Sequence, residues 1–180
     1  MPNQSIEEFR KNVLGRLGLS RPTRYVVQIS PPRASTITIH QPESVTLPSR
    51  QFDTIEDNMY GPVRQVPIRN KYDSSVVMTF PVSKDWSERS VLEGWMDNIV
   101  WPADNTSTYE DVNLGVLKIT CEDSSGNPSA IFTLNEVYPF SIMPIEMGYG
   151  MVNTYTRLQV QFQYRSYDLE LPGTGYRTPI

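Results

Sequence analysis

The sequence of 180 residues predicts a mainly β fold, an antiparallel β-sandwich or barrel with one flanking α-helix and an N-terminal helix. Three observations predict this class. Apolar and polar residues alternate with a strand's period of two in many short segments. Turn signals, mostly prolines and glycines, separate these segments at short intervals. Helical spacing of apolar residues is confined to two segments, and the length favours a single domain with its own core.

The N-terminal segment, residues 4–19, predicts an amphipathic helix. Its apolar stripe consists of Ile6, Phe9, Val13, Leu14 and Leu17. The helix either packs on its own domain or reaches a neighbouring subunit, because a proline-containing link joins it to the body. We expect a helical arm over residues 1–22, a β domain over 23–168, and a loosely held C-terminal tail over 169–180.

Strand signals follow in the first half of the chain. Thr23–Ser30 and Ser35–His40 are expected to pair as antiparallel strands. Ser49–Glu56 and Val63–Asn70 read as two further strands around a turn. Pro67 lies inside the second of them, which places that strand at an edge or at a point without a partner hydrogen bond.

Residues 74–101 combine a strand with the best internal helix candidate. The strand alternates, with three apolar side chains on one face: Val76, Met78 and Phe80. The helix has an apolar face formed by Val91, Leu92, Trp95, Met96, Ile99 and Val100. Ser83 or Asp85 is expected to cap its first turn, with Glu88 placed for a capping box based on Asp85. Trp101-Pro102 ends it.

The second half of the chain begins with a polar loop over residues 102–114. Gly115–Glu122 and Pro128–Glu136 then predict the clearest hairpin of the chain. Tyr138–Met147 is apolar and interrupted by prolines. Thr154–Tyr167 alternates throughout, which predicts one long strand with one face on a core and the other on water.

Composition narrows the function. A formal charge of −4 and a pI near 5.0 argue against a protein that grips nucleic acid. No apolar run approaches the roughly 20 residues of a membrane span. The N-terminus lacks a secretory h-region, so we expect a chain made and kept in a cytoplasm. The single cysteine, Cys121, reads as a small buried hydrophobe.

No catalytic, cofactor-binding or metal-binding set is found in the sequence. The one histidine, His40, has neither a second histidine nor a cysteine cluster with which to bind zinc. No serine lies in a nucleophile-elbow sequence, and no glycine-rich phosphate loop is present. The acidic pairs lie beside turns, where solvated charge is the ordinary state. We therefore expect no enzyme activity, no cofactor and no metal.

The order of the elements resembles a known family, the tail tube proteins of contractile-tail bacteriophages. The matching stretches are RPTRYVVQI, the Leu47-Pro48 step, the run from Ser49 to Ile99, FTLNEVYPFSIMPIEM and TYTRLQVQFQYRSYDL. They cover roughly residues 20–168. The chain departs from the family in its longer N-terminal helix, its 102–114 loop and its tail after Asp168.

The resemblance implies homo-hexameric rings that stack into a hollow tube within the virion tail, assembled in the bacterial host cytoplasm. The implied partners are the tail sheath protein, the baseplate and tail-terminator proteins, and genomic DNA in transit without specific binding. No membrane insertion by this chain is implied. Two related roles stay open, a baseplate tube-initiator ring and the tube protein of a bacterial contractile injection system.

Two groups of residues are candidates for these roles. The candidates for facing the lumen are Ser75 and Thr79 from one strand, or Gln159, Gln161 and Gln163 from another. The candidates for contacts between subunits or rings are Ile6, Phe9, Val13, Met59, Tyr60, Arg64 and Arg69. An alternative of another class is a carbohydrate-binding or adhesion β-sandwich, which would present some of the ten tyrosines as an aromatic platform.

Overall fold

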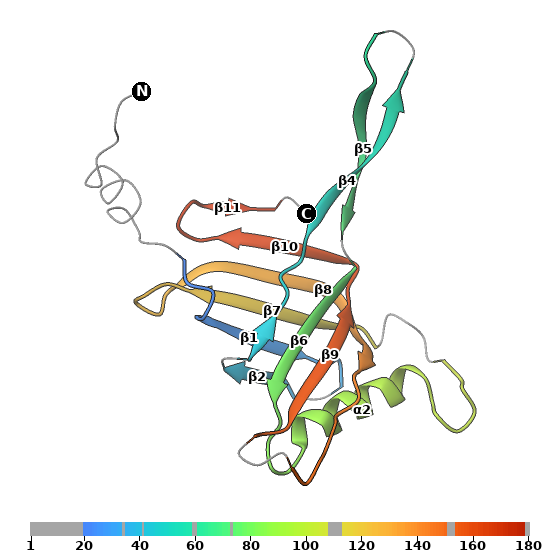
Figure 1. The fold of residues 1–180 in the computed structure, drawn as a ribbon, viewed down its shortest axis with the longest axis vertical. Coiled ribbons are helices and arrows are strands. Elements are labelled where there is room, and N and C mark those ends of the chain that lie inside the picture. Colours follow the sequence, from blue (N-terminus) through green and yellow to red (C-terminus); the bar gives the residue numbers. More distant parts are fainter. Residues whose placement is uncertain are drawn as a thin grey trace.

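The structure is a computed structural model that describes residues 20–33, 35–40, 42–58, 61–72, 74–107, 113–150 and 154–178. The described residues form eleven strands and one helix (Figure 1). Their bounds are β1 (Tyr25–Ser30), β2 (Ile37–His40), β3 (Ser44–Val45), β4 (Arg50–Asp57), β5 (Arg64–Tyr72), β6 (Ser75–Pro81), α2 (Ser87–Ile99), β7 (Gly115–Glu122), β8 (Pro128–Ile142), β9 (Arg157–Gln163), β10 (Ser166–Leu171) and β11 (Tyr176–Arg177). The predicted class, mainly β and antiparallel with one flanking helix, is confirmed for this part of the chain.

Nine strands form one antiparallel sheet that folds back on itself. The order is β2-β1-β7-β8-β9-β6-β3, with β10 beside β8 and β11 beside β10. In Figure 1, β6 and β9 cross steeply over the layer that contains β1, β7 and β10. Both predicted pairings, β1 with β2 and β7 with β8, are present.

The two layers are joined by β8, which is longer than the sequence predicted. Its first half pairs with β7 and β10, and its second half pairs with β9. Glu136, between the halves, has φ of 54°, a left-handed conformation that turns the strand from one layer into the other. The strand continues past Pro139, so the expected interruption there is wrong; Pro139 lies beside a register shift.

The core lies between the layers. The second layer contributes alternate residues of β6 and β9, all at most 1% exposed: Val76, Met78, Phe80, Leu158, Val160 and Phe162. The first layer contributes Val27, Ile29, Leu117, Ile119 and Leu134. Period-two burial of this kind leaves the other face of each strand free for another role.

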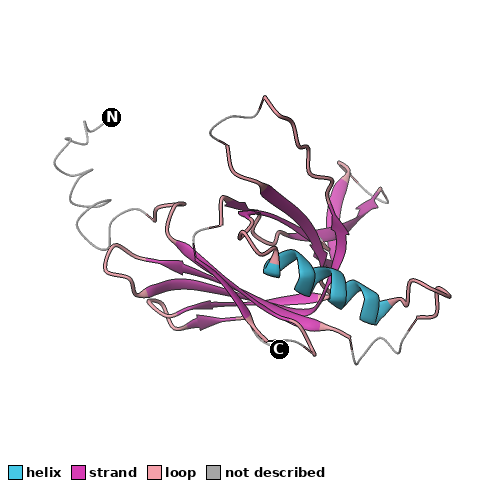
Figure 2. Ribbon diagram, turned by 90° about the horizontal axis from the view of Figure 1, so that it is seen from below, coloured by secondary structure: helices cyan, strands magenta, loops and turns pink. Residues whose placement is uncertain are grey.

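Helix α2 packs against one side of the folded sheet (Figures 1 and 2). Leu92 and Trp95 are buried, and the Trp95 indole Nε1 donates a hydrogen bond of 2.8 Å to the carbonyl oxygen of Asn113. The expected cap is different in detail. Trp86 is the N-cap, in a left-handed conformation and without a side-chain cap bond. Glu88 accepts hydrogen bonds from the backbone N–H and the hydroxyl of Ser83, not from Asp85.

The C-terminal region differs from the prediction in two ways. The expected continuous strand over residues 154–167 is divided at Tyr164-Arg165 into β9 and β10. The tail after Asp168, expected to be loosely held, continues β10 along β8 and returns as β11. Pairing with the long β8 supplies the backbone hydrogen bonds that composition alone did not reveal.

Candidate functional site: a polar sheet face and a projecting hairpin

The polar residues of β6 and β9 lie on one common face. The register pairs Ser75 with Gln163, Val77 with Gln161, and Thr79 with Gln159. The two strands that the sequence offered as alternative channel walls are therefore neighbours, and their candidate residues form one surface. We call this surface, with the residues that extend it on β8, the polar face.

The polar face extends onto the second half of β8. Tyr138 pairs with Gln163 and Ser141 pairs with Gln161 in the strand register. The Tyr138 hydroxyl donates a hydrogen bond to the side-chain oxygen of Gln163. Tyr138 and Ser141 were not predicted from the sequence, because the pairing of β8 with β9 is a long-range contact that alternation alone does not reveal.

The eight residues of the polar face carry no formal charge. They are Ser75, Val77, Thr79, Tyr138, Ser141, Gln159, Gln161 and Gln163. Charge appears at its rim, where Arg157 forms an ion pair of 2.8 Å with Glu43 and stacks 5.0 Å from the centre of the Tyr155 ring. Amides and hydroxyls hydrate well but neither attract nor fix a phosphate strongly.

The second feature is the hairpin of β4 and β5, a two-stranded sheet that projects away from the body (Figure 1). It extends the pair β3 and β6. Residues 46–49 separate β3 from β4, and residues 73–74 separate β5 from β6. A register shift between Asp53 and Thr54 lies opposite Pro67, as expected for a proline in a strand.

Large apolar side chains on this hairpin are exposed. They are Phe52 (60%), Ile55 (59%), Val63 (65%), Val66 (46%) and Ile68 (60%). An isolated two-stranded hairpin is marginally stable in water, and exposed apolar clusters of this kind mark interaction sites. The two strands of this hairpin were predicted from the sequence. The exposure of these residues was not, because their pattern resembles that of a strand with one buried face.

Of the candidate contact residues, Arg64 and Arg69 are described, and both are exposed on the hairpin. Arg69 donates a hydrogen bond of 2.6 Å to Asp53, and this bond lowers the pKa of the Asp53 carboxyl below its ordinary value. Ile6, Phe9, Val13, Met59 and Tyr60 lie outside the described residues.

Other chemistry has little support in the described part of the chain. No group of three His, Cys, Asp or Glu side chains there could hold a metal ion. Within the same residues, no helix has the length and apolar character needed to cross a membrane. Burial raises the pKa of the Cys121 thiol, which makes it a poor nucleophile near neutral pH.

Solved structures of contractile injection systems share this fold. A chain of the anti-feeding prophage (AFP) baseplate superposes with a TM-score of 0.65 at 11% identity, covering 84% of this chain and 95% of that one. A chain of the sheath-tube complex of the extracellular contractile injection system PVC superposes with a TM-score of 0.63 at 15% identity, covering 85% and 92%. The AFP tube-terminating cap gives a TM-score of 0.64 at 13% identity, covering 85% and 91%.

Sequence comparison assigns the family. No curated protein matches the chain. A family model described as "Phage tail tube protein" matches residues 20–170, which is most of the chain and includes every strand of the polar face. This chain belongs to the phage tail tube protein family.

Proposed function

We propose that this protein forms hexameric rings that stack into the hollow tube of a contractile tail, and that the polar face of β6, β9 and β8 lines the channel through which DNA passes. This proposal rests on the polar face, because three paired strands form an uncharged surface there with a mostly apolar core behind it. A wall without positive charge would let phosphates slide without binding.

Sheet edges support assembly into a ring. The layer that carries the polar face runs β3-β6-β9-β8. It ends at β3 and at the second half of β8, and among the described residues each of these pairs with a strand on one side only. Open edges favour pairing with another chain, and a closed ring of protomers would remove both.

The hairpin of β4 and β5 would contact the adjacent ring, together with the N-terminal arm. Its exposed apolar residues make few contacts with the rest of the protomer, so burial against another copy would gain free energy without disturbing the monomer. Arg64 and Arg69 would be the polar contacts at that junction.

A tube of this kind implies partner proteins. We expect a sheath around it, a baseplate at one end and a terminator at the other, assembled in the host cytoplasm. The similar structures come from a baseplate, a sheath-tube complex and a tube-terminating cap. A main tube and a baseplate initiator ring are both compatible with this fold. Neither the fold nor the comparisons favour the carbohydrate-binding alternative.

Cysteine labelling tests the channel wall. In a Cys121→Ser background, Gln161→Cys should react with a bulky maleimide polymer in monomers and become protected in assembled tubes, because the polymer cannot enter the lumen. Glu93→Cys, on the exposed side of α2, is the matched control and should react in both states. Equal labelling of Gln161→Cys in monomers and tubes would show that the polar face does not line the lumen. Negative-stain electron microscopy of the same samples shows whether rings and tubes have formed.

A further inference from the structure

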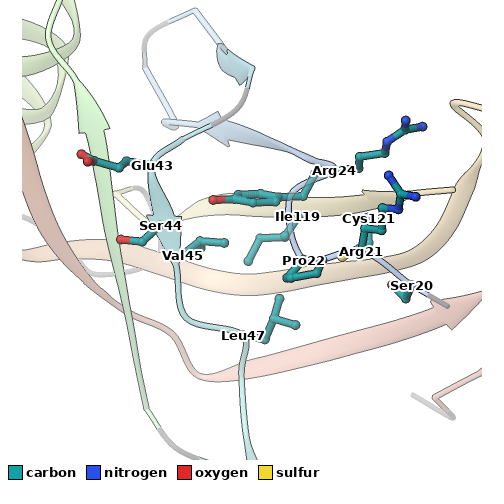
Figure 3. A pocket seen from close by; sticks show the side chains of 11 residues that line it. Ser20, Arg21, Pro22, Arg24, Glu43, Ser44, Val45, Leu47, Ile119 and Cys121 are labelled. Atoms are coloured by element: carbon teal, nitrogen blue, oxygen red, sulfur yellow. The ribbon is translucent and has the colours of Figure 1, made fainter. Parts of the chain in front are cut away.

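A cavity of about 440 Å³ opens beside the free edge of β3 (Figure 3). We call it the seam pocket. Its residues are Ser20, Arg21, Pro22, Arg24, Tyr25, Glu43, Ser44, Val45, Leu47, Ile119 and Cys121. Val45 and Leu47 point into it from one side in Figure 3, and Ile119, which is fully buried, lines it from the opposite side. A large apolar side chain from another chain would fit there.

The walls of the seam pocket are braced. The Tyr25 hydroxyl donates a hydrogen bond of 2.6 Å to the carbonyl oxygen of Pro42, which ties β1 to the segment before β3. Arg24 donates to the carbonyl oxygens of Asp123 and Ser124 at 3.1 and 2.7 Å. The opening is thus preorganised, which lowers the entropic cost of binding. Arg21 and Arg24 give one side of it positive charge.

A complementary feature lies at the opposite edge of the same layer. Between Pro139 and Ser141 the register of β8 against β9 shifts, and Phe140 at this bulge is 53% exposed. Bulges redirect side chains away from the sheet. Six residues after Phe140 comes Glu146, which is followed by Met147, a side chain that is 76% exposed. The segment 140–147 therefore carries two exposed apolar side chains and one negative charge.

We propose that the segment 140–147 of one protomer occupies the seam pocket of the next protomer in the ring, with Phe140 as its apolar anchor and Glu146 toward Arg21. This inference rests on the proposed hexameric ring. Rotation about the ring axis preserves strand direction. Because each strand in β3-β6-β9-β8 is antiparallel to the next, β8 of one protomer meets β3 of its neighbour antiparallel.

Strand geometry favours a second copy over the chain's own N-terminal arm as the occupant. The free edge of β3 offers backbone donors and acceptors, and a neighbouring strand can satisfy them while it delivers an apolar side chain. The arm is expected to be a helix, whose backbone groups are already paired within the helix. An arm in the seam pocket would leave the β3 edge unpaired.

The native Cys121 allows a direct test, because it lines the seam pocket and is the single cysteine of the chain. Phe140→Cys should be cross-linked to Cys121 of the neighbour by a short bismaleimide, giving a ladder of covalent oligomers up to six protomers on a denaturing gel. The reaction is run at mildly alkaline pH, because burial raises the pKa of the Cys121 thiol. The ladder should vanish in Phe140→Cys with Cys121→Ser.

A second variant measures the anchor. Phe140→Ala should raise the protein concentration needed for ring assembly by roughly tenfold, the effect of losing one central aromatic contact. Tyr176→Ala, on β11, removes an aromatic of similar exposure and should leave assembly unchanged. Thermal unfolding of the monomers verifies that both variants fold.

If electron microscopy shows rings but cross-linking gives no ladder of covalent oligomers, this inference is overturned while the proposed tube function still stands. A second result would also overturn this inference: Cys121 is protected from labelling in the full-length monomer and becomes reactive when residues 1–19 are deleted. The seam pocket would then be occupied by the chain's own N-terminal arm. Failure of the unmodified protein to form rings under any condition would overturn the proposed function itself.

Discussion

At Gly115 the backbone of β7 passes so close to Trp95 that no side chain fits. A methyl group there would lie 2.5 Å from the carbonyl oxygen of Ser30 and 2.7 Å from two ring carbons of Trp95. Trp95 is itself held by its hydrogen bond to Asn113 and by the ring of Phe162, whose centroid is 6.4 Å away. The glycine therefore sets the distance between α2 and the first layer of the sheet.

Gly115→Ala should destabilise the monomer by about 1–3 kcal/mol, because neither the backbone of β1 nor the packed indole can move aside without cost. Urea unfolding followed by tryptophan fluorescence measures the change. Gly94→Ala is the matched control: it lies within α2, has no heavy atom within 4 Å of an added methyl group, and should stabilise by about 0.5–1 kcal/mol. Equal stability of the two variants would contradict this account of the contact.

At the scale of elements, the sequence specifies what is local. The helical face of Leu92 and Trp95, the β7–β8 hairpin and the alternation of β9 all arise from residues a few positions apart, and each was predicted. The break between β9 and β10 at Tyr164-Arg165 was not predicted, because the residues that cause it are far away in the sequence. The backbone N–H of Arg165 donates to Asn135 at 3.2 Å, and its side chain pairs with Glu136 at 2.9 Å. Both partners lie at the bend of β8, where the two layers meet.

The projecting hairpin gives a prediction at this same scale. Replacing residues 50–72 with a short glycine-containing turn should leave the monomer's free energy of unfolding nearly unchanged, because β4 and β5 pair mainly with one another. The same deletion should prevent rings from stacking, because it removes the exposed apolar surface of Phe52, Ile55 and Ile68. Calorimetry tests the first outcome and electron microscopy the second. Long tubes from the shortened chain would rule out the hairpin as the contact between rings.

For the whole molecule, the sequence predicted which residues are polar but not that they form one surface. Ser75 and Gln163 are far apart in the chain, and their pairing depends on β9 returning beside β6 after a helix and a hairpin. The exposure of the apolar residues of the β4–β5 hairpin could not be predicted from the sequence for the same reason. Alternation predicts a strand, but it does not predict whether the apolar face meets the protein's own core or another copy.

Assembly multiplies any charge placed on the polar face. Gln161→Lys would add six positive charges to each ring of the proposed hexamer. In the native protein, the residues paired at this position of the polar face are Gln161 and Val77, which are uncharged. We expect tubes of this variant to retain short single-stranded DNA at low salt and to release it as salt increases, because each lysine–phosphate contact displaces counterions. Gln161→Glu should exclude DNA, and Gln161→Asn should behave as the native protein. Fluorescence anisotropy of a labelled oligonucleotide with purified tubes measures retention. Retention by Lys and Glu variants alike would show that residue 161 does not face the passage.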